Sequence, residues 1–288
     1  MNGPGTAVRV TPSRGRADEW AVVLAAAGIP HWVRHRLDGW ALLVPPDDAA
    51  TALQALATYD QENAGEPVAG EAVPPRPWTV TGAVVALLLL GFFAITGPRA
   101  AGSGWFANGS ADAERIVAGQ WWRTITALTL HADPPHALAN AVAVAGLLTA
   151  VCWELGPGLG LWLVLLSGVG GNALTALAHG GDHVSVGAST AVFGAVGVLA
   201  ALRIGAPVGA RSGARRWWVV IAAGLALLAL LGTAAHADLL AHLFGLLVGG
   251  GLGAIGVLAR RRPVPGWGQG VLMLASAVAV AAAWGLAS

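Results

Sequence analysis

The sequence predicts an all-α polytopic membrane protein with a small α+β soluble domain at its amino terminus. Of its 288 residues, 56% are hydrophobic and only 11% are charged, and the mean hydropathy is +0.65. After residue 77 the chain consists largely of apolar runs near the roughly 20 residues that a helix needs to cross a bilayer. The first 63 residues instead alternate short strand-like and helix-like patterns. We therefore expect a membrane domain preceded by a separate soluble one.

Residues 1–63 are expected to fold as a small cytoplasmic α+β domain. Its predicted elements, in chain order, are a strand at 6–10, a helix at 17–28, a hairpin of strands at 31–36 and 40–44, and a helix that ends near residue 63. Asp47 or Asp48 is expected to cap the second helix. This order predicts a small sheet with both helices on one face, and it resembles small ferredoxin-like accessory domains.

Residues 64–77 are rich in proline, lack periodicity and are expected to form a linker. Seven apolar segments follow, at 78–96, 136–153, 158–178, 188–206, 217–234, 238–258 and 267–286. The first six predict a six-helix membrane core over 78–258. A basic loop and a seventh, carboxyl-terminal transmembrane helix make up 259–288.

The distribution of arginine predicts the orientation of these helices. Arginines lie between the fourth and fifth segments (203, 211, 215 and 216) and between the sixth and seventh (260–262), whereas the loops at 179–187 and 235–237 have none. The positive-inside rule therefore puts residues 1–77 in the cytoplasm and the carboxyl terminus outside. The long loop 97–135 carries three arginines on the external side, but long loops count for less. We expect an integral, multi-pass protein of a bacterial cell membrane, with the lipid bilayer as its first partner.

Other functional classes have little support in the composition. A net charge of +1, with one basic run at 260–262, argues against nucleic acid as a partner. The single cysteine, Cys152, excludes an internal disulfide. No cofactor is expected, and the oligomeric state stays open.

A metal site is a rival reading of the external histidines. His179 and His183 are four residues apart with Asp182 between them, and His131 is also external, so a zinc site could be assembled from them. The chain lacks a His-Glu-x-x-His sequence, however, and Gly180-Gly181 disfavours a helix across this segment. A loop with solvated histidines is the better interpretation, so no metal is predicted.

Ser189 lies where a nucleophile would be activated. It follows the glycine-broken loop 184–187 and begins an apolar helix, so the free N–H groups and positive dipole of the first helical turn would stabilise an oxyanion beside it. His242 shares a helix face with Gly245 and Gly249. These glycines would let the helix of His242 approach the helix that begins at Ser189 closely. Contact between these helices would bring the imidazole within reach of the hydroxyl.

His136 and Asn140 are four residues apart and thus share one face at the start of the second segment. Each side chain can donate a hydrogen bond, as an oxyanion hole requires. A polar contact that joins two helices is the alternative role for this pair.

Together these motifs resemble those of the rhomboid intramembrane serine proteases. The matching motifs are Trp122-Arg123 in the first external loop, His136-x-x-x-Asn140, Glu154 at the inner end of the same helix, Gly187-x-Ser189, and Ala241-His242-x-x-Gly245-x-x-x-Gly249. The resemblance covers the six-helix core at 78–258. It implies a serine endopeptidase that cleaves transmembrane segments of membrane-anchored proteins near the external face.

The resemblance also implies a role for each site residue. Ser189 would be the nucleophile and His242 the base, while His136, Asn140 and the Ser189 N–H would hold the oxyanion. One departure is Thr190, since the family most often carries glycine after the serine; the threonine is expected to be tolerated, with a narrower substrate channel as its possible effect. Phe193 stands where the family carries an aromatic residue against the histidine.

Two further functions compete with proteolysis. A catalytically silent rhomboid-like protein would bind transmembrane clients without cutting them, but such proteins usually lack the serine or the histidine that this chain keeps. A transporter would show internal repeats and helices broken at the midplane, and the sequence has neither.

Overall fold

The computed structural model describes residues 5–63, 79–205, 238–261 and 263–288. The chain divides into two compact units, Met1–Arg76 and Pro77–Ser288, which are described separately. The predicted linker at 64–77, the predicted fifth span at 217–234 and the loop at 235–237 lie outside the described residues.

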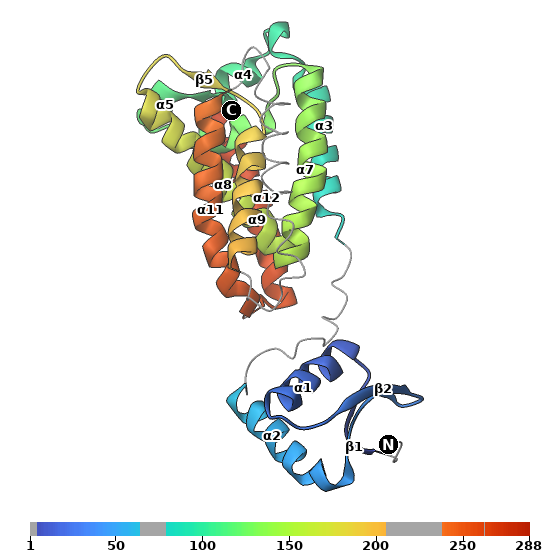
Figure 1. The fold of residues 1–288 in the computed structure, drawn as a ribbon. Helices are drawn as coiled ribbons and strands as arrows, with labels where there is room; N and C mark the ends of the chain where they lie inside the picture. The colour runs from blue at the N-terminus through green and yellow to red at the C-terminus, as the bar shows by residue number, and fades with distance from the viewer. Residues whose placement is uncertain (1–4, 64–78, 206–237, 262) are drawn as a thin grey trace. The chain divides into compact units, whose positions relative to one another are not determined.

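The amino-terminal unit is a three-stranded antiparallel sheet with two helices (Figure 1). Its elements are β1 (Thr6–Thr11), α1 (Arg14–Ala26), β2 (Trp32–Arg36), β3 (Gly39–Val44) and α2 (Ala49–Glu62), and the strand order is β1-β3-β2. Leu42 and Val44 of β3 point to the same face of the sheet, since side chains on a strand alternate, and both belong to one core with residues of α1 and α2. Both helices therefore cover one face, as the element order predicts.

The two helices of this unit begin differently. Ser13 caps α1 and accepts a hydrogen bond from the Arg16 N–H at 3.4 Å. Asp48 occupies the N-cap position of α2, but its side chain makes no capping hydrogen bond. Its φ and ψ of −92° and −4° are helical, because it ends the 3₁₀ turn Pro46–Asp48, whereas a capping side chain needs an extended backbone. Asp48 is therefore the N-cap residue, as expected, but its side chain does not make a capping hydrogen bond.

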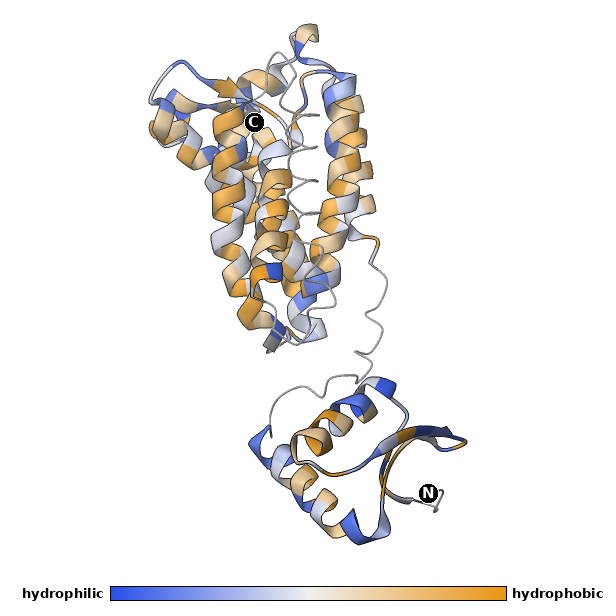
Figure 2. Cartoon of the chain, in the orientation of Figure 1, coloured by the Kyte–Doolittle hydropathy of each residue, from blue (hydrophilic) through white to orange (hydrophobic). Residues whose placement is uncertain are grey.

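Five of the seven predicted spans are helices long and apolar enough to cross a membrane, within the described residues. The first is Thr81–Ala101, which consists of α3 (Thr81–Thr96) and the turns that continue it, and the others are α7 (Pro134–Leu155), α8 (Pro157–His179), α11 (Leu239–Arg261) and α12 (Gly266–Ala287). Apolar residues make up most of each of these helices in Figure 2, as expected for helices that cross a bilayer.

The predicted span at 188–206 is a shorter helix, α9 (Ser189–Ile204), of 16 residues. Every residue from Ser189 to Leu199 is buried, and α9 packs against α7, α8 and α11. Because its neighbours enclose it, α9 does not have to match the thickness of the hydrocarbon region. It forms the centre of the membrane unit.

Glycines allow α9 and α11 to pack with their backbones in contact. A Cβ atom on Gly245 would overlap the Thr190 carbonyl, and one on Gly249 would overlap the carbonyl of Gly194. This close approach is the one expected from the glycines that share a face with His242. It sets the distance between the helix that begins at Ser189 and the helix that carries His242.

The segment between α3 and α7 folds into short elements that surround Arg123. They are η2 (Arg99–Ala101), α4 (Gly104–Gly109), β4 (Ala111–Asp112), α5 (Ala113–Val117), α6 (Arg123–Thr126) and η3 (Ala127–Thr129). Arg123 is 3% exposed and donates to the carbonyls of Ala107 and Ser110, both at 3.0 Å. Burial, and then the charge of Arg115, lowers the pKa of Arg123. Trp122, the other residue of the Trp122-Arg123 motif, immediately precedes α6.

At the end of the bundle far from Ser189, Glu154 pairs with two arginines. Arg260 of α11 donates to the Glu154 carboxylate and to the Leu202 carbonyl, and Arg203 lies 3.6 Å from the same carboxylate. These contacts connect α7, α9 and α11. Glu154 therefore stabilises the core at a distance from the candidate site.

The last helix, α12, docks on the core at both of its ends. Near its start, the Gln269 Oε1 accepts hydrogen bonds from the backbone N–H groups of Gly158 and Leu159, at 2.8 and 2.9 Å, and its Nε2 donates to the Leu155 carbonyl. Near its end, the Trp284 indole N–H donates to the Thr129 hydroxyl at 3.1 Å. α12 is therefore joined both to the α7–α8 turn and to the segment that precedes α7.

Candidate active site

Ser189 and His242 are in contact. The Ser189 Oγ lies 2.9 Å from the His242 Nε2, and the two residues are 8% and 3% exposed. Ser189 is the first residue of α9, so its own N–H has no partner within the helix. Phe193, one turn further along α9, stacks on the imidazole with ring centroids 4.4 Å apart and an interplanar angle of 21°.

The geometry of this contact suits proton transfer from the serine to the histidine. When Nε2 accepts from the hydroxyl, Nδ1 carries the ring hydrogen of the neutral imidazole. Nδ1 is buried and has no hydrogen-bond partner among the described residues. Asp238, one turn earlier, directs its carboxylate to His183 and to the Ala241 N–H instead. The arrangement in the described part of the chain is a pair of residues rather than a triad.

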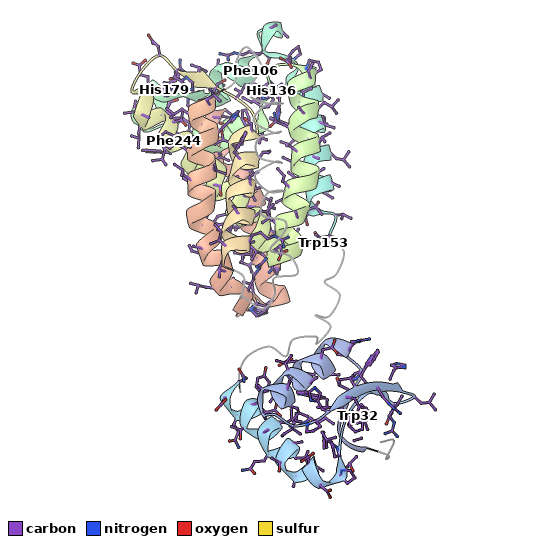
Figure 3. All side chains as sticks on the ribbon, viewed as in Figure 1. Trp32, Phe106, His136, Trp153, His179 and Phe244 are labelled. Atoms are coloured by element: carbon purple, nitrogen blue, oxygen red, sulfur yellow. The ribbon has the colours of Figure 1, made fainter. Side chains whose placement is uncertain are left out.

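The His136 ring lies next to the turn that precedes Ser189 (labelled in Figure 3). Its Nδ1 accepts from the Ala132 N–H at 3.4 Å, so its Nε2 carries the hydrogen in the neutral ring. A Cβ atom on Gly187 would lie 2.7 Å from this Nε2, and the Gly187 φ is +127°. Glycine therefore provides both the backbone conformation and the space that let this donor approach Ser189.

Asn140 is close to the site but does not line the cavity described below. It is completely buried, and its Nδ2 donates to the His136 carbonyl one turn earlier at 2.9 Å. An amide nitrogen carries two hydrogens, so one remains for a second acceptor. The Oδ1 is buried and has no described partner.

His131 is part of this site, although the sequence offered it only as an external histidine in the metal site that was not predicted. It is completely buried, its Nε2 accepts from the Ala188 N–H at 3.5 Å, and its ring lies edge-on to His136 with centroids 5.3 Å apart. Burial, followed by the charge of His136, lowers the pKa of His131 to about 3. A neutral imidazole can accept this backbone hydrogen bond. In the sequence, the only indication that His131 belongs to the site is its short spacing ahead of His136.

A cavity of about 1070 Å³ opens beside these residues. Its lining comes from η2, the start of α7, the loop before α9 and the start of α11, and includes Arg99, Asp133, His136, Ser185, Ser189, Thr190, Asp238 and His242. Ser189, His242 and His136 thus face one space. A peptide segment in this cavity could reach all three.

Thr190 fills a notch rather than projecting freely into the cavity. It is 4% exposed, and a Cβ atom on Gly171 of α8 would overlap its γ-methyl group. The absence of a side chain at Gly171 therefore accommodates the β-branched residue. The same cavity wall includes Asn172, whose Nδ2 donates to the Thr124 carbonyl at 2.9 Å.

The histidines considered for a metal site do not gather into a metal-binding cluster in the described segments. His179 and His183 stack at 3.9 Å, whereas His131 lies below the Gly187-Ala188 turn. The His183 Nε2 instead lies 2.6 Å from the Asp238 carboxylate.

Comparison with known proteins identifies the domain that carries this site. A family model of the rhomboid domain matches residues 118–259. Residues of the chain are 39% identical over 83 positions to the putative rhomboid protease YdcA of Bacillus subtilis, covering 29% of this chain and 42% of YdcA. They are 32% identical over 123 positions to the rhomboid protease GluP of the same organism, covering 42% of this chain and 24% of GluP. The chain thus matches less than half the length of each of these relatives. The chain therefore contains a rhomboid domain, at residues 118–259, and is distantly homologous to Bacillus rhomboid proteases.

Proposed function

We propose that this protein is an intramembrane serine endopeptidase that cleaves transmembrane segments of membrane-anchored proteins near the external face of a bacterial cell membrane. The observation that carries the proposal is the 2.9 Å contact between the Ser189 Oγ and the His242 Nε2 at the wall of a large cavity. The names of the relatives, both rhomboid proteases, agree with this chemistry.

In the proposed reaction, the Ser189 Oγ forms a bond to the scissile carbonyl carbon while its proton passes to the His242 Nε2. The imidazolium then donates that proton to the leaving amine as the C–N bond breaks. Water next attacks the acyl-enzyme, with His242 as the base, and Ser189 is released. Stacking on Phe193 holds the imidazole in place through both steps.

Three donors would stabilise the oxyanion. The Ser189 backbone N–H is free at the start of α9, and the His136 Nε2–H lies against Gly187. The second amide hydrogen of Asn140 is the third candidate, and a side-chain rotation would have to bring it to the cavity, which Asn140 does not line. Losing one such donor typically lowers turnover about 100- to 1000-fold.

The proposed membrane arrangement follows from the sequence. Residues 78–258 would form a six-helix core, in which the described helices α3, α7, α8, α9 and α11 are joined by a span at 217–234, and α12 would be an added seventh helix. The amino-terminal domain at 1–63 would be cytoplasmic, which puts Ser189 and His242 near the external side. Short α9, enclosed by its neighbours, agrees with a buried site that water reaches from one end.

Cleavage of a transmembrane reporter protein in liposomes tests this proposal. Wild-type protein should cut the reporter, whereas Ser189→Ala and His242→Ala should not. Ser276→Ala is the matched control, because this buried serine bonds the Leu272 carbonyl of its own helix and lies outside the cavity. Cleavage that survives Ser189→Ala would overturn the mechanism.

A catalytically silent, client-binding protein is the second candidate. It predicts that folded wild-type protein captures transmembrane segments but leaves them intact. It also predicts that a serine-directed phosphonate probe does not label Ser189.

A further inference from the structure

We propose that His183 and Asp238 form a positioning pair that holds the loop before Ser189 against the start of the helix that carries His242. The inference rests on the proposed function, which assigns no role to either residue. The His183 Nε2 lies 2.6 Å from the Asp238 Oδ2, and their side chains are 25% and 11% exposed. Because an ionised carboxylate only accepts hydrogen bonds, the His183 Nε2 carries the hydrogen.

The His183 side of the pair is fixed from two other directions. Its carbonyl accepts from the Ala113 N–H at 2.9 Å, and the next two residues form β5 (Val184–Ser185), which pairs with β4. The face of its ring stacks on His179, which itself bonds the Thr175 carbonyl at 3.0 Å at the end of α8 (Figure 3 labels His179). His183 therefore enters the contact with Asp238 as an anchored group, with little rotamer freedom left to lose.

The Asp238 side is fixed by the helix that it caps. Its Oδ1 accepts from the Ala241 N–H at 3.0 Å, and its carbonyl accepts from the His242 N–H at 3.0 Å. One carboxylate oxygen thus caps α11, and the other binds His183. A displacement of Asp238 would move the turn from which His242 projects.

The pair connects the segment before Ser189 with the segment before His242, on the side where both residues of the proposed dyad face the cavity. His183 precedes Ser189 by six residues, Asp238 precedes His242 by four, and both pair residues line the same cavity as the dyad. Among the described residues, no other hydrogen bond joins the segment 180–188 to α11. On its opposite side the segment is held by the Gly187 N–H, which donates to the Ala127 carbonyl at 2.9 Å. Without the pair, the relative position of Ser189 and His242 would depend on their own contact and on the packing of α9 against α11.

Two variants distinguish the loss of the His183–Asp238 contact from the loss of the α11 cap and from the loss of the stacking on His179. Asp238→Ser keeps a good helix-capping oxygen but is too short to reach His183. His183→Phe keeps a ring that can stack on His179 but cannot donate to Asp238. Asp182→Ser, one residue away on the same loop and exposed, is the control.

The first readout is catalytic. Each single variant should lower kcat for a transmembrane reporter, and the rate at which a phosphonate probe labels Ser189, by about tenfold, since small misplacements of reacting groups are costly. KM should change little, and the double variant should be no worse than either single one, because both remove the same contact. Unchanged or faster probe labelling, or additive losses, would overturn the positioning role.

The second readout does not depend on proteolysis. Amide hydrogen exchange at 184–188 and 239–242 should become faster in both single variants and stay at the wild-type rate in Asp182→Ser. Inactive wild-type protein with this pattern of exchange would refute the proposed function and leave the link between the segments standing. Exchange that matches wild type in both variants would refute the link itself.

Discussion

The His136 ring occupies the space that a side chain on Gly187 would need. A Cβ atom at this position would lie 2.7 Å from the His136 Nε2 and 2.8 Å from its Cε1, and the φ of +127° is strained for any other residue. The glycine before the serine is thus a requirement of the proposed oxyanion donor as well as of the turn.

Gly187→Ala should therefore abolish the proposed protease activity without unfolding the protein. Displacement of His136 removes one oxyanion donor, and turnover should fall at least about 100-fold. Reporter cleavage and thermal unfolding measured on the same sample check this. Gly180→Ala, at another positive φ but with open space around it, is the control and should keep most of its activity. Equal losses in both variants would contradict the specific role of Gly187.

His131 should make the protein less stable in acid. Its pKa in the folded protein is lowered to about 3, whereas an unfolded histidine has a pKa of about 6.5. The unfolded state therefore binds more protons between these values, so the stabilisation present above about pH 6.5 is lost progressively as the pH falls toward 3.

Between pH 7 and pH 5 this loss should reach about 2 kcal/mol. His131→Gln, which keeps an acceptor for the Ala188 N–H, should show a correspondingly flatter dependence of unfolding free energy on pH. Parallel pH profiles for the two proteins would show that His131 does not titrate in this way.

Thr190 and Gly171 should depend on each other. Gly171→Ala puts a methyl group against the Thr190 γ-methyl and the Gly245 backbone, so it should destabilise the protein by about 1–3 kcal/mol. Thr190→Ser removes the γ-methyl and should restore part of that loss in the double variant. A double-mutant cycle on unfolding free energies measures the coupling, and additive effects would contradict it.

The polar contacts of α12 should stabilise the core. Gln269→Leu leaves the Gly158 and Leu159 N–H groups without their acceptor in a partly buried position, which should cost a few kcal/mol. Gln269→Glu keeps that acceptor and should cost less. Unfolding in mixed micelles measures both variants, with Trp267→Phe on the exposed face of the same helix as control. An unchanged unfolding free energy in Gln269→Leu would show that α12 docks through its apolar contacts alone.

The pattern of the sequence predicted the helices better than the details of the site. Apolar runs located α3, α7, α8, α11 and α12, because length and hydropathy decide which segments can cross a bilayer. The glycines at 245 and 249 predicted the close approach of α9 and α11, and that approach is the geometry on which the contact of Ser189 with His242 depends.

Contacts between distant segments could not be predicted in the same way. The hydrogen bond of His131 to Ala188 spans 57 residues, and the pair of His183 with Asp238 spans 55. Neither has a periodic pattern, since both depend on how short elements between α3 and α7 fold around Arg123. The space at Gly171 that receives Thr190 is likewise a product of helix packing, because the sequence does not indicate which of the glycines at 168, 170 and 171 faces Thr190.

Covalent labelling of Ser189 tests the central claim most directly. Folded protein in liposomes would be treated with a serine-directed phosphonate probe, and the modified residue would be identified by mass spectrometry in wild type and in His242→Ala. The account predicts rapid modification of Ser189 in the wild type and a loss of at least about 100-fold in rate without His242. An unmodified Ser189 in folded wild-type protein, or labelling of Ser189 at the same rate in His242→Ala, would contradict it.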